Sequence, residues 1–320
     1  MKPFKIDVAV LLLFFARPEQ TSKVFAAIKE ARPSKLFLYQ DGPRDDKDDM
    51  KNILACREVV EDIDWECDVH KMYLERNQGC DPSGYLSRKW MFGVVDKGII
   101  LEDDCVPCNS FFLFCKELLD RYENDQRINM ICGMNNLETY NCGESDYFFT
   151  SSGSVCGVAT WKRVVDEWDP EYKFLSNQYV IDTLKDNLGK SYVNKLLGTC
   201  KWHKASGKEY FETIGGMNMY LSGRYNIVPA KNMICNIGIS ANSTHSYSNM
   251  SLLPRAIRSL FFMKTYELKF PLKHPDYVVA DRRYMDLLQK RMTGNWFVRT
   301  FKIRSIETLL NKYIPFFAKL

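Results

Sequence analysis

The sequence lacks any apolar run of the roughly 20 residues that would span a bilayer. The apolar run at residues 8–16 is nine residues long, and Asp7 interrupts it beforehand. It is followed by Arg17-Pro18 and not by a small-residue cleavage site, so a buried strand explains it better than a secretion signal. We therefore expect a cytoplasmic protein that is soluble or lies on the inner face of the membrane.

Histidine is scarce, and the cysteines lack the spacing of a disulfide framework. The chain has 4 histidines and 11 cysteines, and an odd, scattered set of cysteines favours reduced thiols in a cytosol. Cys105 and Cys108 have the spacing of a zinc knuckle, but no second pair follows them. A structural zinc site is not expected, because it needs four ligands.

Charge is unevenly distributed in a chain that has ample material for a core. The 320 residues are 46% hydrophobic and 26% charged, which excludes a disordered chain. Residues 251–320 hold 14 basic and 5 acidic residues, whereas residues 1–250 hold 30 and 35. We predict a domain at 1–250 and a basic helical extension at 251–320.

Apolar residues at helical spacing in 291–320 predict contact with an anionic membrane surface. The alternative is a helix docked on the domain, and nucleic acid is not expected because no binding motif is present.

Apolar runs alternate with amphipathic segments through the first half of the chain. We predict strands at 8–15, 35–40, 68–75 and 98–101, and helices at 19–29, 46–61, 86–95 and 110–122. Alternation of this kind is typical of βαβ units and predicts an α/β fold with a mainly parallel sheet flanked by helices. Ligands of such sheets bind at the carboxyl ends of the strands.

Three acidic residues, Glu102, Asp103 and Asp104, directly follow the predicted strand at 98–101. Such a group cannot be buried without a cation that offsets the repulsion between its charges. Carboxylate oxygens suit Mg²⁺ or Mn²⁺, which in turn bridges phosphates. The alternative is a solvated helix N-terminus, where acidic residues are favoured by the helix dipole.

Together with other motifs, this acidic element resembles the metal-binding motif of GT-A glycosyltransferases, of the N-acetylglucosaminyltransferase I type and related bacterial enzymes. The likeness covers about residues 6–246. The further motifs are Phe14-Phe15-Ala16-Arg17-Pro18, Tyr39-Gln40-Asp41-Gly42-Pro43, Arg76-Asn77-Gln78-Gly79-Cys80, Gly157-Val158-Ala159-Thr160-Trp161, and Pro229 to Gly238 followed by Thr244-His245. The resemblance implies a Rossmann-like GT-A domain with a nucleotide-sugar half at about 1–106 and an acceptor half at about 107–250.

The resemblance also implies roles for single residues. Asp104 and His245 would hold Mn²⁺ or Mg²⁺, with Asp103 near the ribose and Glu102 supporting the site. Asp41 would accept from the base N–H, Arg17 would approach the base or the phosphates, and Arg76 would balance the charge of the diphosphate. A turn-forming Asp41 and solvated arginines are the alternatives.

Two positions depart from the pattern of the family. Phe211-Glu212 stands where the bacterial relatives carry Trp-Asp, so Glu212 is the predicted catalytic base, with Glu209 as a near neighbour. Val158 replaces a tryptophan, and Trp161 is either an acceptor wall or a core aromatic. The polar segment at 199–209 is predicted to be a loop, either a lid or an ordinary surface loop.

The predicted function is metal-dependent transfer of a sugar from a nucleotide-diphosphate sugar, in particular a UDP-sugar. The acceptor would be a hydroxyl of a glycan or lipid-linked glycan, with inversion, in bacterial surface polysaccharide or glycoconjugate synthesis. One alternative is a sugar nucleotidyltransferase, but the turn at 14–18 contains no glycine, unlike the Gly-rich loop of those enzymes. The other alternative is a non-catalytic glycan- or partner-binding protein on the same fold.

Overall fold

The computed structural model describes residues 1–239 and 255–293. The strands are β1 (Ile6–Phe14), β2 (Pro33–Gln40), β3 (Asp68–Tyr73), β4 (Lys97–Glu102), β5 (Cys105–Pro107), β6 (Ile128–Cys132), β7 (Tyr147–Thr150), β8 (Val158–Trp161), β9 (Tyr225–Pro229) and β10 (Ile234–Asn236). The helices are α1 (Pro18–Ala31), α2 (Met50–Val60), α3 (Cys80–Phe92), α4 (Ser110–Arg121), α5 (Lys162–Val165), the 3-10 helix η1 (Lys173–Ser176), α6 (Gln178–Leu188), α7 (Lys190–Ser206), α8 (Phe211–Leu221), α9 (Arg255–Arg258) and α10 (Arg282–Thr293).

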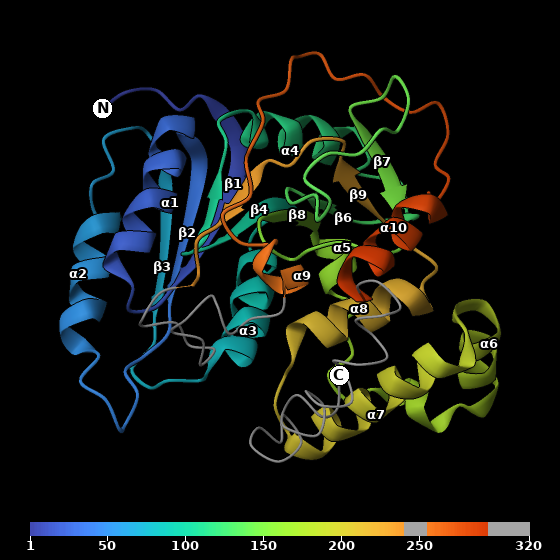
Figure 1. Ribbon diagram of the computed structural model, residues 1–320. Coiled ribbons are helices and arrows are strands. Elements are labelled where there is room, and N and C mark those ends of the chain that lie inside the picture. Colours follow the sequence, from blue (N-terminus) through green and yellow to red (C-terminus); the bar gives the residue numbers. More distant parts are fainter. Residues whose placement is uncertain (240–254, 294–320) are drawn as a thin grey trace.

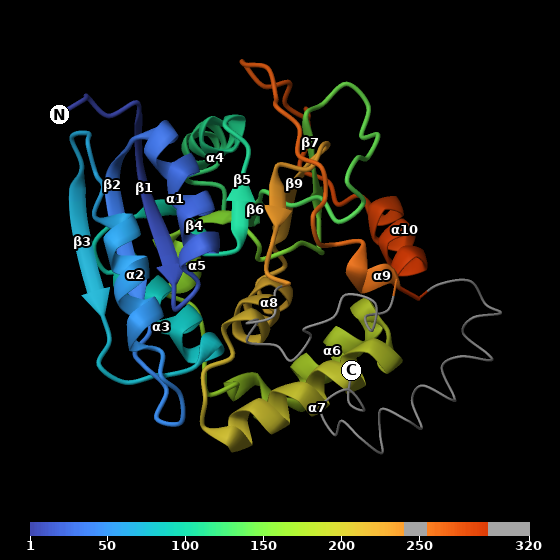
Figure 2. The ribbon, with the colours of Figure 1, turned by 60° about the vertical axis from the view of Figure 1, so that its left-hand side comes forward.

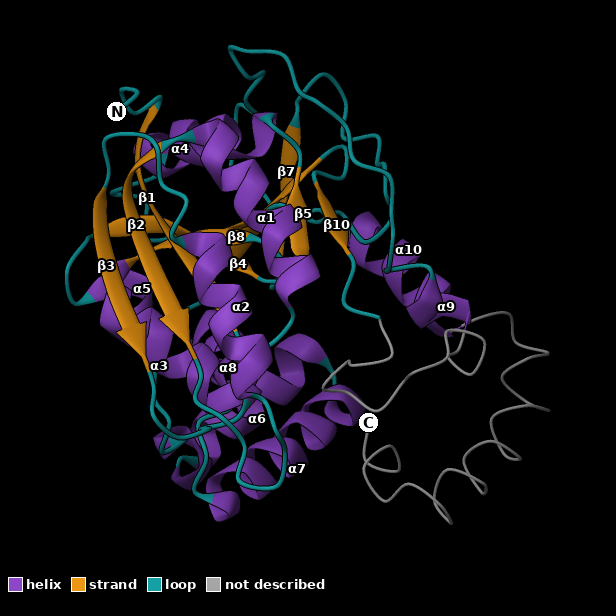
Figure 3. Cartoon of the chain, turned by 90° about the vertical axis from the view of Figure 1, so that its left-hand side faces the viewer, coloured by secondary structure: helices purple, strands orange, loops and turns teal. Residues whose placement is uncertain are grey.

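Eight strands form one twisted sheet in the order β3-β2-β1-β4-β8-β6-β9-β7 (Figures 1 and 3). β8 and β7 run antiparallel to their neighbours, while the other pairs are parallel. The predicted α/β class with a mainly parallel sheet flanked by helices is confirmed. β10 and β5 form a separate two-stranded ribbon beside the end of β4.

The two faces of the sheet are covered by different helices because side chains alternate along β1. Val10 and Leu12 face one side and join a core with α1, α2 and α4. Ala9 and Leu11 face the other side and pack with Met91 of α3 and with α5. Figure 2 shows α1 and α2 in front of β1–β3, with α3 beyond them. Burial of both faces explains why β1 reads as a continuous apolar run.

Two predicted helices begin elsewhere than expected. The helix predicted at 46–61 starts at Met50, because the Asp49 carboxylate accepts from the backbone N–H of Arg44 and from its guanidinium at 2.6–3.1 Å, which holds the preceding residues in a turn. The helix predicted from residue 86 starts at Cys80, directly after Gly79 with φ 92°. Gly79 allows the chain to turn sharply from β3 into α3.

The prediction of a loop at 199–209 is wrong for residues 199–206 and holds only for the last three residues, which connect α7 to α8. Residues 199–206 form the last turns of α7, which ends at Gly207 in the left-handed conformation. The buried face of α7 is Val193, Leu197, Cys200 and His203, a helical repeat whose last two members are not typical apolar residues. This face packs on α6 and α8 in a helical layer below the sheet (Figures 1 and 2).

His203 is expected to make the fold less stable in acid. Its ring stacks on that of Tyr210, with the two ring centres 3.6 Å apart. Burial lowers the pKa of His203. As pH falls below about 6.5, the unfolded chain binds a proton that the folded chain resists, so the free energy of unfolding decreases. Urea unfolding at pH 7.5 and pH 5 should show a smaller acid-induced loss in His203→Phe than in the wild type. Equal losses in both proteins would contradict this assignment.

The described part of the predicted extension packs on the body of the protein. Met263 and Leu272 join the main core. Tyr284 of α10 packs against Phe148, with the two ring centres 4.7 Å apart. Glu267 accepts from the backbone N–H groups of Asn109, which precedes α4, and of Ser110, the first residue of α4. The predicted boundary at 250/251 and most of the segment 291–320 lie outside the described residues. Within 1–239 and 255–293, no helix is long and apolar enough to cross a membrane.

Candidate functional site

The acidic triplet lies at the carboxyl end of β4, in the middle of the sheet. Glu102 is the last residue of β4 and pairs with Leu13 of β1 in the register of the two strands. The backbone N–H of Asp103 donates to the carbonyl of Leu13 at 3.0 Å. The chain then enters β5, so Asp103 and Asp104 occupy the turn beside the segment that follows β1.

Arg17, in that segment, holds the two aspartates of the triplet. Its guanidinium contacts Oδ1 of Asp103 through Nη2, Oδ2 of Asp103 through Nε at 3.3 Å, and Asp104 through Nη1 at 3.2 Å. The Asp103 side chain is 4% exposed, while that of Asp104 is 16% exposed. Burial raises the pKa of Asp103, an effect that Arg17 opposes. Burial by itself lowers the pKa of Arg17, but the carboxylates of Asp103 and Asp104 raise this pKa above its usual value.

Asp41, at the end of β2, ties two loops together. Its carboxylate accepts from the backbone N–H groups of Gly42, Gln78 and Gly79 at 2.8–3.0 Å. Burial raises its pKa, although these hydrogen bonds lower it. A Cβ at Gly42 would lie 2.4 Å from the backbone of Arg76, so glycine is needed for this contact. The Arg76 side chain is exposed on the same loop. Recognition of a base by Asp41 stays a prediction.

Glu102 faces a buried arginine that the sequence analysis missed. Nη2 of Arg88 is 3.5 Å from Oε1 of Glu102, and Nη1 donates to the carbonyl of Gly84 at 2.8 Å. Arg88 is 3% exposed, and burial lowers its pKa. Burial raises the pKa of Glu102 to about 7, against the effect of Arg88 and with smaller contributions from Asp104 and Glu212. Glu102 therefore lies within electrostatic reach of both these carboxylates. In the sequence, only the helical spacing of Gly84 and Arg88 hinted at this arrangement.

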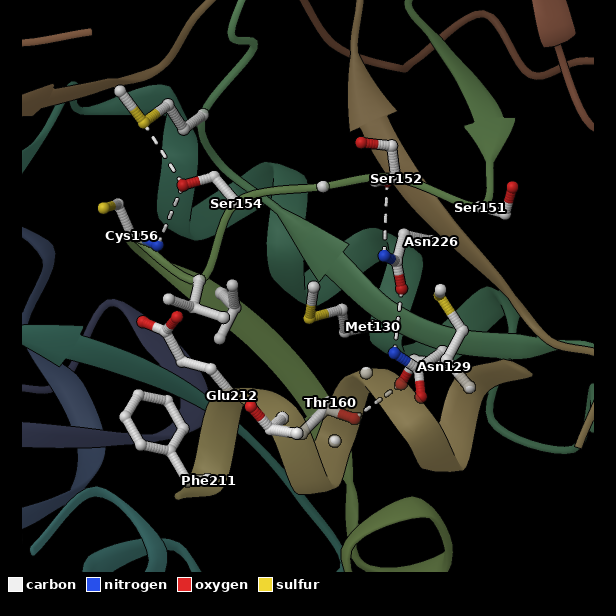
Figure 4. A pocket seen from close by; sticks show the side chains of 18 of the residues that line it. Asn129, Met130, Ser151, Ser152, Ser154, Cys156, Thr160, Phe211, Glu212 and Asn226 are labelled. Atoms are coloured by element: carbon white, nitrogen blue, oxygen red, sulfur yellow. Dashed lines mark hydrogen bonds between the residues drawn. The ribbon is translucent and has the colours of Figure 1, made fainter. Parts of the chain in front are cut away.

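Glu212 lies in the first turn of α8, where α8 crosses α3 closely. A Cβ at Gly84 would lie 2.4 Å from the ring of Phe211, and the Arg88 guanidinium lies 4.1 Å from the centre of the same ring. This packing sets the start of α8 beside the end of β4. Figure 4 shows Glu212 reaching up from α8 toward Cys156.

A cavity of about 630 Å³ lies between α8 and the strands β6, β8 and β9. Arg88 and Glu212 are the charged residues among its described lining, and Asn129 and Asn226 are among the polar ones. Residues 257–261 of the C-terminal segment contribute apolar side chains. The cavity is therefore largely neutral, with its charged groups next to the triplet.

Trp161 belongs to the core and does not line this cavity. It is 2% exposed, and its indole N–H donates to the carbonyl of Leu119 at 3.1 Å. The expectation of an acceptor-side wall at Trp161 is corrected accordingly, because β8 directs this ring toward α4. The other predicted residue from the second half, His245, lies outside the described residues.

The carboxylate chemistry of the triplet fits a hard divalent cation, but only in part. Across residues 1–239 and 255–293, no group of three or more His, Cys, Asp or Glu side chains could hold a metal ion. Asp104 is the more exposed of the two aspartates, and one of its oxygens is engaged by Arg17. Because Mg²⁺ is commonly held by one or two carboxylates together with phosphates and water, a single protein ligand suffices when a diphosphate is bound.

No known family model matches the chain, and no curated protein matches its sequence. Solved structures with some likeness include the glycosyltransferase GlyE of Streptococcus pneumoniae TIGR4, with TM-score 0.34 and 11% identity over 94% of this chain and 64% of that one. A UDP-glucose pyrophosphorylase complexed with UDP-glucose gives TM-score 0.36 and 8% identity over 72% and 92% of the two chains. The inositol-1-phosphate CTP transferase from T. maritima gives 0.39 and 10% over 79% and 94%. The chain thus spans less than two thirds of GlyE, and similarities this low carry no argument about function.

Proposed function

We propose that this protein transfers a sugar from a nucleotide-diphosphate sugar, in particular a UDP-sugar, to a hydroxyl of a glycan acceptor with inversion. The observation that carries the proposal is that the β4 triplet and Glu212 share one neighbour: Arg88 lies 3.5 Å from Glu102 and lines the cavity together with Glu212. The two are far apart in the sequence and come from the two halves of the predicted catalytic domain. An acidic strand end that binds a cation would suit a diphosphate donor, and a largely neutral cavity beside it would suit an uncharged acceptor.

On the acceptor side, Glu212 is proposed as the general base. As the acceptor oxygen attacks the anomeric carbon, the bond from that carbon to the diphosphate breaks and the hydroxyl proton passes to the Glu212 carboxylate. Phe211 and the close approach at Gly84 fix the start of α8 and thereby orient this carboxylate. A positioned carboxylate contributes typically about 10²–10⁴-fold to such a step.

On the donor side, the diphosphate is proposed to lie at the end of β4, near Asp103, Asp104 and Arg17. Asp104 would hold Mn²⁺ or Mg²⁺, and the ion would offset the charge that develops on the leaving diphosphate. Asp41 and Arg76 lie on the adjoining loops and are proposed to contact the base and the phosphates. His245 is proposed as a second ligand from outside the described residues. The segment 291–320 remains proposed as the contact with an anionic membrane surface.

Asp104→Asn is expected to abolish metal-dependent nucleotide binding, because it removes the charge but keeps the shape of the side chain. In the wild type, UDP with Mn²⁺ should raise the melting temperature more than either ligand alone, because both bind the folded state. Asp120→Asn is the matched control, since Asp120 forms exposed ion pairs with Lys97 and Lys116. The proposal is wrong if the wild type shows no metal-dependent stabilisation by UDP.

Turnover separates the proposed function from its alternatives. The wild type should release UDP from at least one UDP-sugar when metal and a glycan are present. A nucleotidyltransferase would instead release pyrophosphate from a nucleoside triphosphate and a sugar phosphate. Binding of UDP or glycan without turnover of any donor would favour a non-catalytic protein on the same fold.

A further inference from the structure

One face of α8 borders the cavity, and a side chain is missing from the middle of that face. Glu212, Gly216 and Tyr220 recur every four residues, so they share this face, and all three line the cavity. Glu212 stands at its start (Figure 4). Because four residues rise about 6 Å along a helix, Glu212 and Tyr220 are separated by about 12 Å along the axis, with Gly216 between them.

The glycine at position 216 is not explained by packing within the described residues. A Cβ at Gly216 would have none of their atoms within 4 Å, whereas a Cβ at the neighbouring Gly215 would lie 3.2 Å from the ring of Trp168. Glycine in a helix interior destabilises the helix relative to alanine. Gly215 is required by a close contact, and Gly216 instead leaves open space above the helix backbone.

Two tyrosines from different helices close the far end of this face. The hydroxyl groups of Tyr192 in α7 and Tyr220 are 2.9 Å apart in a hydrogen bond, and their rings meet edge to face with centres 6.2 Å apart. Both residues line the cavity. Their hydrogen bond uses one of two O–H donors, so the pair can offer an occupant the second O–H group and further lone pairs.

The groups on this face are accessible. Tyr192 is 46% exposed, the Glu212 side chain is also exposed, and Gly216 and Tyr220 are partly exposed. Because the same four residues line the cavity, an occupant of that space can reach them without a rearrangement of the helices.

The occupant that fits this space is a sugar ring. A pyranose has apolar faces that pack on aromatic side chains, and hydroxyl groups that form hydrogen bonds with a tyrosine hydroxyl or a carboxylate. An anionic group would be repelled by Glu212. An apolar chain would bury the Glu212 carboxylate without supplying a hydrogen-bond donor, which is costly.

We propose that the acceptor sugar binds over Gly216, between the Glu212 carboxylate and the Tyr192–Tyr220 pair. The inference rests on the proposed transferase function, because it places the reacting hydroxyl beside Glu212 as the base. Gly216 then determines specificity, because the absence of a side chain leaves the space in which the ring lies. Tyr192 contributes an aromatic contact and a hydroxyl group at the other end of the ring.

The first test fills the space above α8. Gly216→Leu places a branched apolar side chain where the ring is proposed to lie. Gly198→Leu is the matched control, because Gly198 lies within α7, a Cβ there would also meet no described atom within 4 Å, and the residue is not part of the described cavity lining. Leucine favours a helix more than glycine does, so neither variant should melt below the wild type.

Binding is measured by saturation-transfer NMR on the full chain with the methyl β-glycosides of glucose, galactose, mannose and N-acetylglucosamine. UDP with Mn²⁺ serves as the donor-side probe in the same samples. At least one glycoside should bind the wild type and Gly198→Leu equally. Binding of that glycoside should be lost in Gly216→Leu, while UDP binding stays unchanged.

The second test removes the aromatic end of the proposed subsite. Tyr192→Ala should weaken binding of the same glycoside by about tenfold, as expected for the loss of one aromatic contact and one hydrogen bond. Tyr179→Ala is the matched control, since Tyr179 of α6 is 80% exposed and is not part of the described cavity lining. It should bind the glycoside as the wild type does.

The inference is overturned if no glycoside binds, or if either Gly216→Leu or Tyr192→Ala binds it as tightly as the wild type. If Gly216→Leu unfolds, the result for Tyr192→Ala alone decides. UDP binding in these samples shows which idea has failed. Where UDP binds and the glycosides do not, the acceptor subsite is refuted and the proposed function stands. Where neither binds, both are refuted.

Discussion

Replacing Glu212 by glutamine is expected to lower the rate of sugar transfer by about 10²–10⁴-fold, the usual contribution of a positioned general base. Glutamine keeps the size of the side chain but cannot take the proton of the acceptor hydroxyl. Donor binding should persist, because the diphosphate is proposed to lie on the triplet side of the site. The measurement is UDP release at saturating donor and acceptor, with UDP binding followed by thermal shift.

Glu209→Gln is the matched control for this experiment. Glu209 precedes α8 by two residues and is not part of the described cavity lining. Its variant should keep a rate close to that of the wild type. A large loss of rate in Glu209→Gln together with an active Glu212→Gln would refute Glu212 as the general base and assign that role to Glu209.

Replacing Arg17 by methionine is expected to destabilise the fold by about 3–5 kcal/mol, because it leaves a buried carboxylate without its partner. Asp103 is the residue left unpaired, and its side chain is 4% exposed. The measurement is the free energy of unfolding from urea denaturation at neutral pH. Arg17→Met combined with Asp103→Asn should recover part of the loss, since no charge then remains buried at position 103.

An exposed ion pair provides the comparison for Arg17. Arg127 pairs with Asp125 at 2.7 Å, and its side chain is 60% exposed. Arg127→Met should cost no more than about 1 kcal/mol, because solvent screens such pairs. If Arg17→Met were as mild as Arg127→Met, the buried pair would contribute nothing to stability, and Arg17 would be left for donor binding alone.

Local sequence patterns were enough to predict the strand ends at which donor binding is proposed. Continuous apolar runs predicted β1 and β4. The acidic residues that directly follow the β4 run were then expected at the carboxyl edge of a parallel sheet, where ligands bind. The pattern failed at α7, where Cys200 and His203 occupy the buried face in place of typical apolar residues. A window that counts only strongly apolar residues cannot detect such a helix.

Residues whose position depends on contacts between distant segments could not be predicted in the same way. From the sequence alone, Arg88 would be interpreted as a solvated helix residue. In the structure, Phe211 of α8 packs against its guanidinium. Trp161 carried two interpretations, and the packing of β8 against α4 decided for the core. Asn129 and Asn226 gave no signal, because neither lies in a recognisable motif and their amides meet only when β6 and β9 pair.

By itself, the sequence determined the α/β class, the positions of the first four strands along the chain and the acidic group that follows β4, because strand formation and strand ends depend on short-range periodicity. The tertiary structure alone decided that Arg17 engages Asp103 and Asp104, that Arg88 contacts Glu102 and lines the same cavity as Glu212, and that the side-chain oxygens of Asn129 and Asn136 are buried without a partner in the described part of the chain. These features depend on which distant side chains are brought into contact and which buried polar atoms are left without a partner. These contacts are determined by packing between distant segments, so no pattern among neighbouring residues of the chain predicts them.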